Sequence, residues 1–185
     1  MRADAAKRRQ LIVQEARRLF AAHGSDVALE AVAEAAGVGI ATLYRNFESR
    51  AALADEVALT ILADMRAAGT EALERVGCSP EDAWVGYVQR LVELDLGALS
   101  ATLAEFVTDE ISESVRDAQA QTLAGVEELL DAVRSAGIVR PDLDALELVL
   151  AIGLITRPLP DAIRAVTPDL VPRLVSIVLA GMRPS

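Results

Sequence analysis

The sequence is poor in the side chains that bind metals or cross-link a chain. It has one cysteine, Cys78, and one histidine, His23. A single cysteine excludes a disulfide within the chain, and the two residues together are too few for a zinc site or a histidine-based triad in one chain. Acidic residues are plentiful, but neither a nucleophile–base pair nor a phosphate-binding loop accompanies them. We therefore expect no metal, no cofactor and no enzymatic activity.

Aromatic residues and long hydrophobic runs are also scarce. Aromatic side chains make up 3% of the 185 residues, whereas hydrophobic residues make up 52%. A composition rich in alanine and poor in aromatic residues favours helix over sheet. The longest apolar run, 148–155, is too short to span a bilayer, and no signal peptide opens the chain. The sequence thus predicts a cytoplasmic helical protein without a membrane segment.

Positive charge is in the minority, but it is unevenly distributed along the chain. The formal net charge is −10. Residues 1–53 carry eight Lys or Arg and six Asp or Glu, whereas the remaining residues carry ten basic and 22 acidic side chains. The acidic total therefore conceals a basic N-terminal part, which is compatible with nucleic-acid binding.

Apolar residues recur at helical spacing throughout, and no stretch alternates with a period of two. Glycines and prolines mark the expected helix ends, with Ser49 and Asp144 as candidate N-caps. The predicted fold class is all-α, with about nine helices. We expect them at residues 4–23, 29–36, 40–47, 49–68, 80–96, 101–107, 113–136, 144–156 and 167–181.

The second and third predicted helices have the spacing of a helix-turn-helix. Gly37 separates two short helices, and Ala33, four residues earlier, is small enough for a close helix crossing. Val32, Ala36, Leu43 and Phe47 supply the shared apolar centre. Such hairpins also occur in proteins that do not bind DNA, so the spacing alone leaves both possibilities open.

The third helix has a polar face opposite its apolar one. Thr42 and Arg45 lie opposite Leu43 and Phe47, with Ala41 and Asn46 beside them. A helix that presents small residues, one hydroxyl and one guanidinium is suited to a DNA major groove. Gly39 and Ala41 would let it approach the bases closely.

The residues of this region match a known pattern. The run from 33 to 47, AEAAGVGIATLYRNF, followed by Ser49, Arg50 and Leu53, resembles the N-terminal signature of the TetR family of bacterial transcriptional regulators. Residues 19–24 resemble the end of the first helix of that family, and 136–142 and 178–183 are similar to its C-terminal half. The resemblance is specific over residues 8–55 and colinear beyond them.

The resemblance implies that the chain has two domains with different functions. Residues 1–53 would form the helix-turn-helix DNA-binding domain, and 54–185 a ligand-binding and dimerisation bundle. The phosphate-binding roles of the family would fall on Tyr44 and Arg50, whereas Ala28 lacks the capping hydroxyl that often touches phosphate. The basic arm adds Lys7, Arg8 and Arg9, while Arg17 and Arg18 are interpreted as solvated surface. The candidate DNA-binding residues are Lys7, Arg8, Gly39, Ala41, Thr42, Tyr44, Arg45, Asn46 and Arg50.

Two helices of the second part are apolar on nearly every side. Residues 145–155 carry one charge, Glu147, and the last helix is similar. Pairing both helices with their twofold copies would cover the exposed faces as a four-helix interface. The alternative is that both are core helices of one chain. A charge placed in this region, as in Ile152→Glu, is expected to yield monomer or aggregate and to abolish operator binding.

The resemblance also implies an effector site within the bundle. The candidate residues lie along the apolar sides of the helices that would enclose it, and Asp95 could meet a cationic ligand or simply be solvated. Each candidate could instead be plain core. The candidate ligand-binding residues are Met65, Trp84, Tyr87, Val88, Leu91, Phe106 and Thr122.

The expected function is a homodimeric, ligand-responsive repressor. It would bind a palindromic double-stranded DNA operator and be released by a small apolar effector, with no membrane partner. One alternative is an activator. Another is a helical small-molecule-binding protein without a DNA-reading role, against which the intact Tyr44, Arg45 and Arg50 argue.

Overall fold

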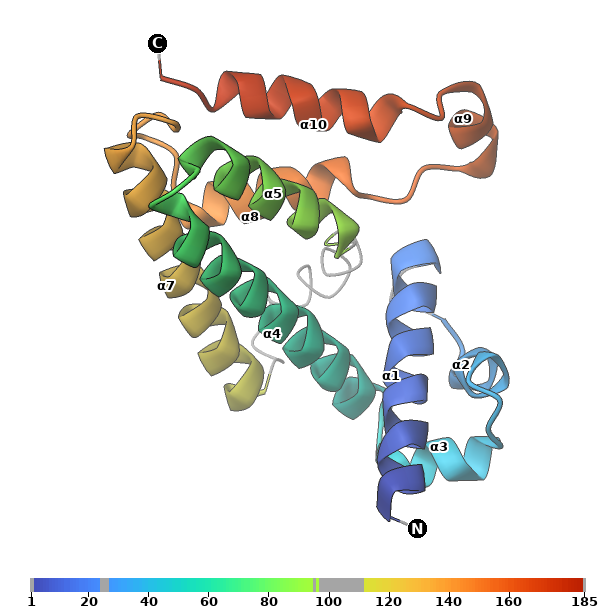
Figure 1. The fold of residues 1–185 in the computed structure, drawn as a ribbon. Helices are drawn as coiled ribbons and strands as arrows, with labels where there is room; N and C mark the ends of the chain where they lie inside the picture. The colour runs from blue at the N-terminus through green and yellow to red at the C-terminus, as the bar shows by residue number, and fades with distance from the viewer. Residues whose placement is uncertain (1, 24–26, 95, 97–111, 185) are drawn as a thin grey trace.

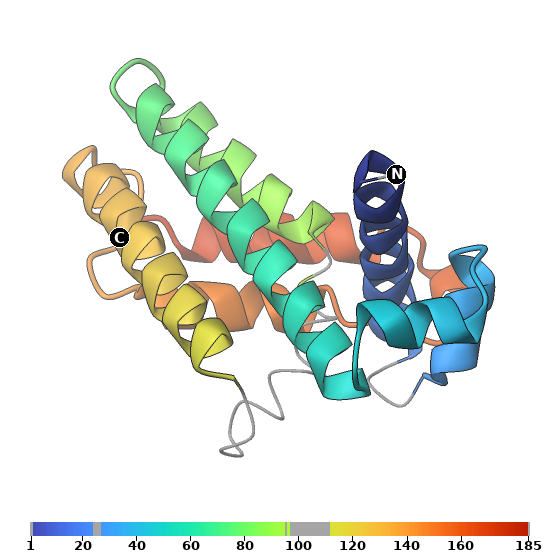
Figure 2. The ribbon, with the colours of Figure 1, turned by 90° about the horizontal axis from the view of Figure 1, so that it is seen from below.

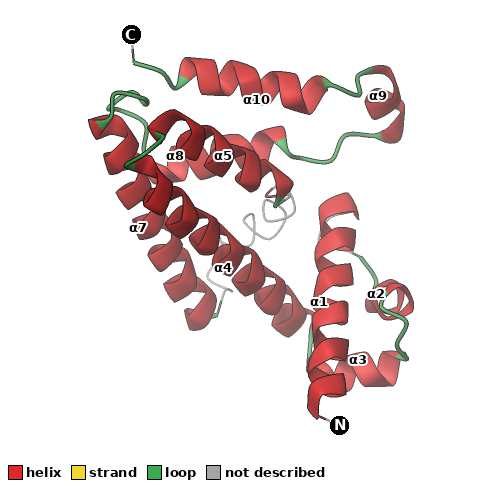
Figure 3. Ribbon diagram, viewed as in Figure 1, coloured by secondary structure: helices red, strands yellow, loops and turns green. Residues whose placement is uncertain are grey.

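The structure is a computed structural model that describes residues 2–23, 27–94, 96 and 112–184. In these ranges all regular secondary structure is helical (Figure 3), which agrees with the all-α prediction. The expected helix at 101–107 lies outside the described residues. The nine described helices are α1 (Arg2–His23), α2 (Leu29–Ala35), α3 (Ile40–Asn46), α4 (Arg50–Val76), α5 (Pro80–Glu93), α7 (Glu113–Ser135), α8 (Ala145–Ile155), α9 (Asp161–Val166) and α10 (Leu170–Gly181).

Helices α1 to α3 gather at one end of the molecule, and α4 leads from them into the C-terminal bundle (Figure 1). There α4 packs against α5 and α7, as the view from below also shows (Figure 2). Helix α8 contacts α5, α7 and α10. One apolar core runs through both parts, from Ile12 of α1 to Val175 of α10. None of the described helices is long and apolar enough to cross a membrane.

Local sequence signals account for several helix ends. Ser49 accepts a hydrogen bond from the Ala52 amide at 3.1 Å, and Asp144 accepts one from the Glu147 amide at 2.7 Å. Both expected N-caps are therefore confirmed. Gly37 and Gly137 follow α2 and α7 with φ of 64° and 72°. Glycine suits this left-handed region because a Cβ would be strained there.

The structure differs from the expected helices at two other places. Helix α4 continues through Gly69 to Val76 instead of ending near residue 68. Gly69 is buried in the middle of the helix, and a Cβ there would lie in ordinary van der Waals contact with the Tyr87 ring of α5, at 3.8 Å, so the glycine does not mark a helix end. The segment between α8 and α10 contains the short α9, which was not among the expected helices.

Candidate nucleic-acid interface and effector site

Helix α3 separates its apolar and polar sides as expected. Leu43 is fully buried and Phe47 is 2% exposed, and both belong to the shared core. On the other side Ala41 and Arg45 are exposed, and 49% of Tyr44 is accessible. Three of the predicted DNA contacts therefore lie on one accessible surface, held in place by the buried side of the same helix.

The two predicted base-reading side chains are in contact. The Nη2 atom of Arg45 donates to Thr42 Oγ1 at 2.9 Å. Gly39 caps the start of α3, and a Cβ there would have no atom within 4 Å. The packing of the protein therefore does not require a small residue at position 39.

Asn46 is turned back onto its own helix. Its side-chain Nδ2 donates to the Thr42 backbone carbonyl at 2.8 Å. The backbone carbonyl of Asn46 accepts a hydrogen bond from Arg9 Nη1 at 2.7 Å. The Arg9 guanidinium also pairs with Glu56 at 2.8 Å and lies 4.2 Å from the centre of the Phe47 ring. Arg9 thus differs from the expectation of a free basic arm, because it fixes α1 to α3 and α4.

The remaining candidates lie around this surface. Lys7 and Arg8 are exposed on the first turns of α1, where Arg8 Nε donates to the Asp4 carbonyl at 3.2 Å. Arg50 is half-buried at the start of α4, and its Nη2 donates to the Val27 carbonyl. This bond ties α4 to the start of α2, an internal role that the sequence pattern did not indicate.

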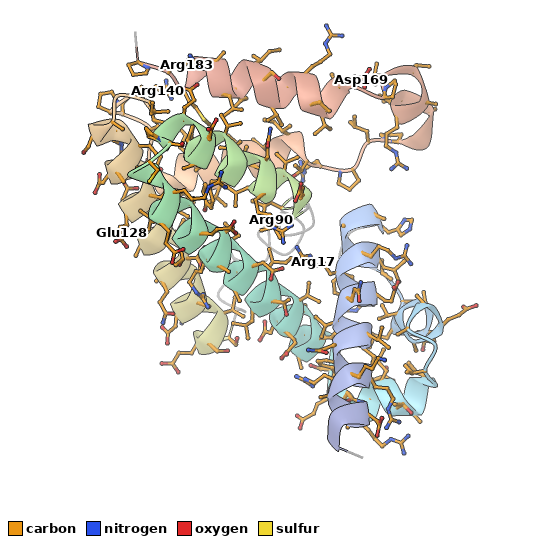
Figure 4. All side chains as sticks on the ribbon, viewed as in Figure 1. Arg17, Arg90, Glu128, Arg140, Asp169 and Arg183 are labelled. Atoms are coloured by element: carbon orange, nitrogen blue, oxygen red, sulfur yellow. The ribbon has the colours of Figure 1, made fainter. Side chains whose placement is uncertain are left out.

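Arg17 corrects another expectation. Its side chain is only 21% exposed and its Nη1 pairs with Asp64 of α4 at 2.7 Å. Its Nη2 donates to the Leu94 carbonyl, next to the end of α5, at 3.0 Å. Figure 4 shows Arg17 on the side of α1 that faces the bundle. Arg17 therefore joins the first helix to two helices of the bundle, whereas Arg18 is 62% exposed, as expected for surface.

The described effector candidates are all buried where α4, α5 and α7 pack together. The Trp84 and Tyr87 rings lie 6.5 Å apart on α5. Phe106 and Asp95 lie outside the described residues. The exposed fractions are 1% for Met65, 3% for Trp84, 2% for Tyr87, 0% for Val88 and Leu91, and 1% for Thr122.

Two of these buried residues carry polar atoms with different surroundings. Thr122 Oγ1 donates to the Ala118 carbonyl at 2.7 Å and accepts from Arg66 Nη1 at 3.3 Å. Tyr87 has no hydrogen-bond partner for its buried hydroxyl, and burial raises the pKa of this phenol well above its ordinary value. Its side chain borders a crevice of about 140 Å³ between α4 and α5. The sequence did not indicate a role for Arg66, because its hydrogen-bond partner Thr122 lies 56 residues away.

Helix α8 has a buried side and an exposed apolar side. Ile152 is fully buried in the core of its own chain. Leu146, Leu150 and Leu154, spaced by four residues, are 49%, 44% and 64% exposed, and Ile177 of α10 is 66% exposed. The charge of Ile152→Glu would therefore enter the protomer core, so this change does not test the dimer interface by itself.

Comparisons with known proteins agree with this geometry. Residues 12–57 match the model of bacterial regulatory proteins of the tetR family, and 79–184 match the C-terminal domain of SbtR-like transcriptional regulators. No curated protein matches the sequence.

Two solved structures of similar sequence extend over nearly the whole chain. The TetR transcription regulatory protein from Mycobacterium vanbaalenii is 30% identical, with a TM-score of 0.63 and 99% of both chains covered. The TetR transcriptional regulator SCO0520 from Streptomyces coelicolor is 27% identical, with a TM-score of 0.64, covering 96% of this chain and 99% of that one. The helix-turn-helix, the C-terminal match and these structures together place the chain in the TetR family of DNA-binding transcriptional regulators, a family without enzymatic activity.

Proposed function

We propose that the protein is a homodimeric repressor that reads a palindromic operator through α3 and is released by an effector bound between α4, α5 and α7. The observation that carries the DNA-reading role is the exposed side of α3, where Ala41, Tyr44 and Arg45 are accessible while Leu43 and Phe47 anchor the helix. Arg45 and Thr42 would contact base edges. Tyr44, Asn46, Arg50, Lys7 and Arg8 would contact the phosphate backbone.

The stripe on α8 supports the homodimer. Leu146, Leu150 and Leu154 recur every four residues, which places them on one side of the helix. Each exposes more than two fifths of its surface in the single chain. A second copy related by a twofold axis would cover this stripe and Ile177, which removes apolar surface from water. The same twofold axis would present two α3 helices to a palindrome.

The buried hydroxyl of Tyr87 supports an effector site in the bundle. A buried donor without a partner costs roughly 1–3 kcal/mol, so a ligand that accepts its hydrogen bond would gain stability from it. Val88 and Leu91 on the same helix offer only apolar contact, and Trp84 adds an aromatic ring with one N–H donor. The fitting effector is therefore largely apolar, with a hydrogen-bond acceptor for the Tyr87 phenol.

Arg17 supports a mechanical connection between the two sites. It bonds to Asp64 of α4 and to the Leu94 carbonyl beyond α5, and both helices carry effector candidates. An effector that shifts either helix would change the position of α1 and so the spacing of the two α3 helices. Only the difference in its affinity for the two arrangements can drive release.

Selection of DNA fragments from the source genome by the purified protein tests the DNA-reading role. We expect a palindromic sequence to be enriched, and a reporter gene placed behind it to be expressed more strongly when the protein is absent. Lower expression in its absence would identify an activator. Enrichment of no sequence would favour the small-molecule-binding alternative.

A library of small molecules tests the effector role in the same preparation. Effectors should raise the melting temperature and release the selected operator. Stabilising ligands that leave operator affinity unchanged at saturation would contradict the effector model while leaving the DNA-reading role intact.

A further inference from the structure

Helix α3 is short and depends on its neighbours for its orientation. It has seven residues and begins at Gly39, which has no side chain to cap the helix. A helix this short is not stable by itself in water. Helix α2 packs against α3, and the end of α3 lies beside α1 and the start of α4 (Figure 1). The contacts at the end of α3 therefore help to determine how its exposed side is presented.

The Arg9 guanidinium makes three contacts at the end of α3. Its Nη1 donates to the Asn46 backbone carbonyl at 2.7 Å, and its Nη2 donates to the Glu56 carboxylate at 2.8 Å. Its Cζ lies 4.2 Å from the centre of the Phe47 ring. The Asn46 carbonyl belongs to the last turn of α3, where carbonyls lack a partner within the helix and a cation complements the helix dipole. Arg9 therefore caps the end of α3 from another helix.

A contact between Arg9 and a DNA phosphate would require a different arrangement. Both Nη atoms and one face of the guanidinium already have partners within the protein. Turning the side chain toward DNA would break the bond to the end of α3 and separate the charge from Glu56, which costs free energy. Lys7 and Arg8, in contrast, are exposed on the first turns of α1. The geometry thus favours an Arg9 side chain that stays within the protein.

A second ion pair between α1 and α4 provides a comparison for Arg9. Arg17 pairs with Asp64 at 2.7 Å, whereas Arg9 pairs with Glu56 at 2.8 Å. The other bond of Arg17 goes to the Leu94 carbonyl, and that of Arg9 goes to α3. The two arginines therefore make the same kind of link to α4 but hold different elements. Arg17→Ala is a matched control for the loss of an α1–α4 ion pair.

We propose that Arg9 is a positioning residue for DNA reading, which sets the angle at which Thr42 and Arg45 meet the base edges without touching DNA itself. This role rests on the proposed function, because it concerns how α3 reads an operator. Hydrogen bonds to base edges depend on the exact placement of the side chains, whereas the phosphate attraction is independent of sequence. Loss of Arg9 therefore lowers selectivity more than general affinity for DNA.

Titrations of the full chain on the selected operator and on scrambled DNA, at several salt concentrations, test this role. Arg9→Ala should lower the ratio of operator affinity to scrambled-DNA affinity about tenfold, because α3 loses a charged hydrogen bond at its end. The salt slope should stay the same, and Arg17→Ala should leave the ratio unchanged. Equal losses on both DNAs, with a salt slope reduced by roughly one per half-site, would mean that Arg9 contacts phosphate and would overturn the proposal.

Glu56→Gln separates positioning from phosphate contact by the direction of the change. The neutral side chain keeps its shape but holds Arg9 less firmly, so the affinity ratio should fall by a smaller factor than in Arg9→Ala. If Arg9 contacted phosphate, losing the competing carboxylate would raise both affinities and leave the ratio constant, which would overturn the proposal. Arg9→Lys keeps the charge without the planar fork and should restore only part of the ratio.

Amide hydrogen exchange of the DNA-free protein tests the hold on α3 without any operator. Arg9→Ala should speed exchange at residues 44–47 about tenfold, because the last turn of α3 loses its cap, whereas Arg17→Ala should not. Unchanged exchange there would overturn the proposal. A wild type that binds both DNAs equally would contradict the proposed function and this role with it. A selective wild type whose selectivity survives in Arg9→Ala would overturn this role alone.

Discussion

At the scale of single residues, one guanidinium lies at the centre of the proposed recognition surface. Arg45 projects from the exposed side of α3 and bonds to Thr42 Oγ1, so its position is restricted before DNA arrives. Arg50 differs, because its bond to the Val27 carbonyl makes it part of the domain's own framework. We therefore expect Arg45 to contact DNA bases and Arg50 to contact the DNA phosphate backbone.

Arg45→Ala should lower operator affinity by about 1–3 kcal/mol per half-site and relax the preference at particular base pairs, because Arg can bond guanine through two atoms. Arg50→Ala should weaken all sequences alike, lower the salt slope by roughly one per half-site and reduce the melting temperature. Titrations on operator and scrambled DNA at several salt concentrations measure the difference. Equal losses on both DNAs for Arg45→Ala would contradict its assignment.

Tyr87→Phe should stabilise the ligand-free protein by about 1 kcal/mol, since it removes a buried hydroxyl that has no partner. The same change should weaken binding of any effector that accepts a hydrogen bond from this phenol. Urea unfolding measures the first effect and ligand titration the second. A less stable variant would mean that the hydroxyl has a partner in solution.

Alkaline pH should separate the wild type from Tyr87→Phe further. Burial raises the pKa of Tyr87 in the folded state, whereas in the unfolded chain the phenol ionises near its ordinary pKa of about 10. The difference in stability between the two proteins is therefore constant below pH of about 10, and above it the wild type loses about 1.4 kcal/mol per pH unit relative to the variant. Unfolding curves from pH 9 to 11 should show this decline as a difference between wild type and variant. Tyr44 is present in both proteins and cancels from that difference.

At the scale of elements, one helix connects the recognition surface to the bundle, and two others keep apolar side chains exposed. Helix α4 has 27 residues and therefore spans about 40 Å, from Arg50 beside the recognition surface to the bundle. Helices α8 and α10 keep apolar side chains exposed in the single chain. In the proposed function the connecting helix carries the effect of the ligand, and the exposed pair forms the dimer interface.

Leu150→Glu should yield a folded monomer that binds the operator weakly, because the charge enters the proposed interface but not the core. Sedimentation velocity and circular dichroism measure assembly and helix content. Ile152→Glu is the matched control two residues away and should unfold the protein, since Ile152 is fully buried. A dimeric Leu150→Glu protein with normal operator affinity would show that the interface lies elsewhere.

Arg17→Ala should uncouple the effector from DNA, because it removes both bonds that join α1 to the bundle through this residue. We expect operator affinity to be retained while release by a saturating effector becomes weaker. Gel-shift titrations with and without effector measure the coupling factor. Arg183→Ala, which removes an exposed ion pair with Glu81, is the control and should leave coupling unchanged. Unaltered coupling in Arg17→Ala would assign the connection to other contacts.

At the scale of the whole molecule, the sequence predicted what depends on local spacing. Gly37, Leu43 and Phe47 define the helix-turn-helix within eleven residues, and the N-caps at Ser49 and Asp144 act over three. The sequence did not predict interactions between segments that lie far apart along the chain. Arg17 was interpreted as surface because Asp64 lies 47 residues away, and nothing near Arg17 in the sequence indicates that pairing.

The same limit applies to the faces of the apolar helices. The run from 145 to 155 is nearly uniform, so periodicity alone does not distinguish Ile152 from Leu150. Only the packing of α8 against α5, α7 and α10 determines which side is covered. Gly69 is a similar case, because its role as a contact for the Tyr87 ring depends on where α5 crosses α4.

Hydroxyl-radical footprinting on the selected operator tests the central claim most directly. A dimer that reads DNA through α3 should protect two half-sites related by a twofold axis, one helical turn of about 34–36 Å or a multiple of it apart. Arg45→Ala should weaken both protected patches together. A single protected patch, or equal protection of scrambled DNA, would contradict a dimeric operator-reading regulator.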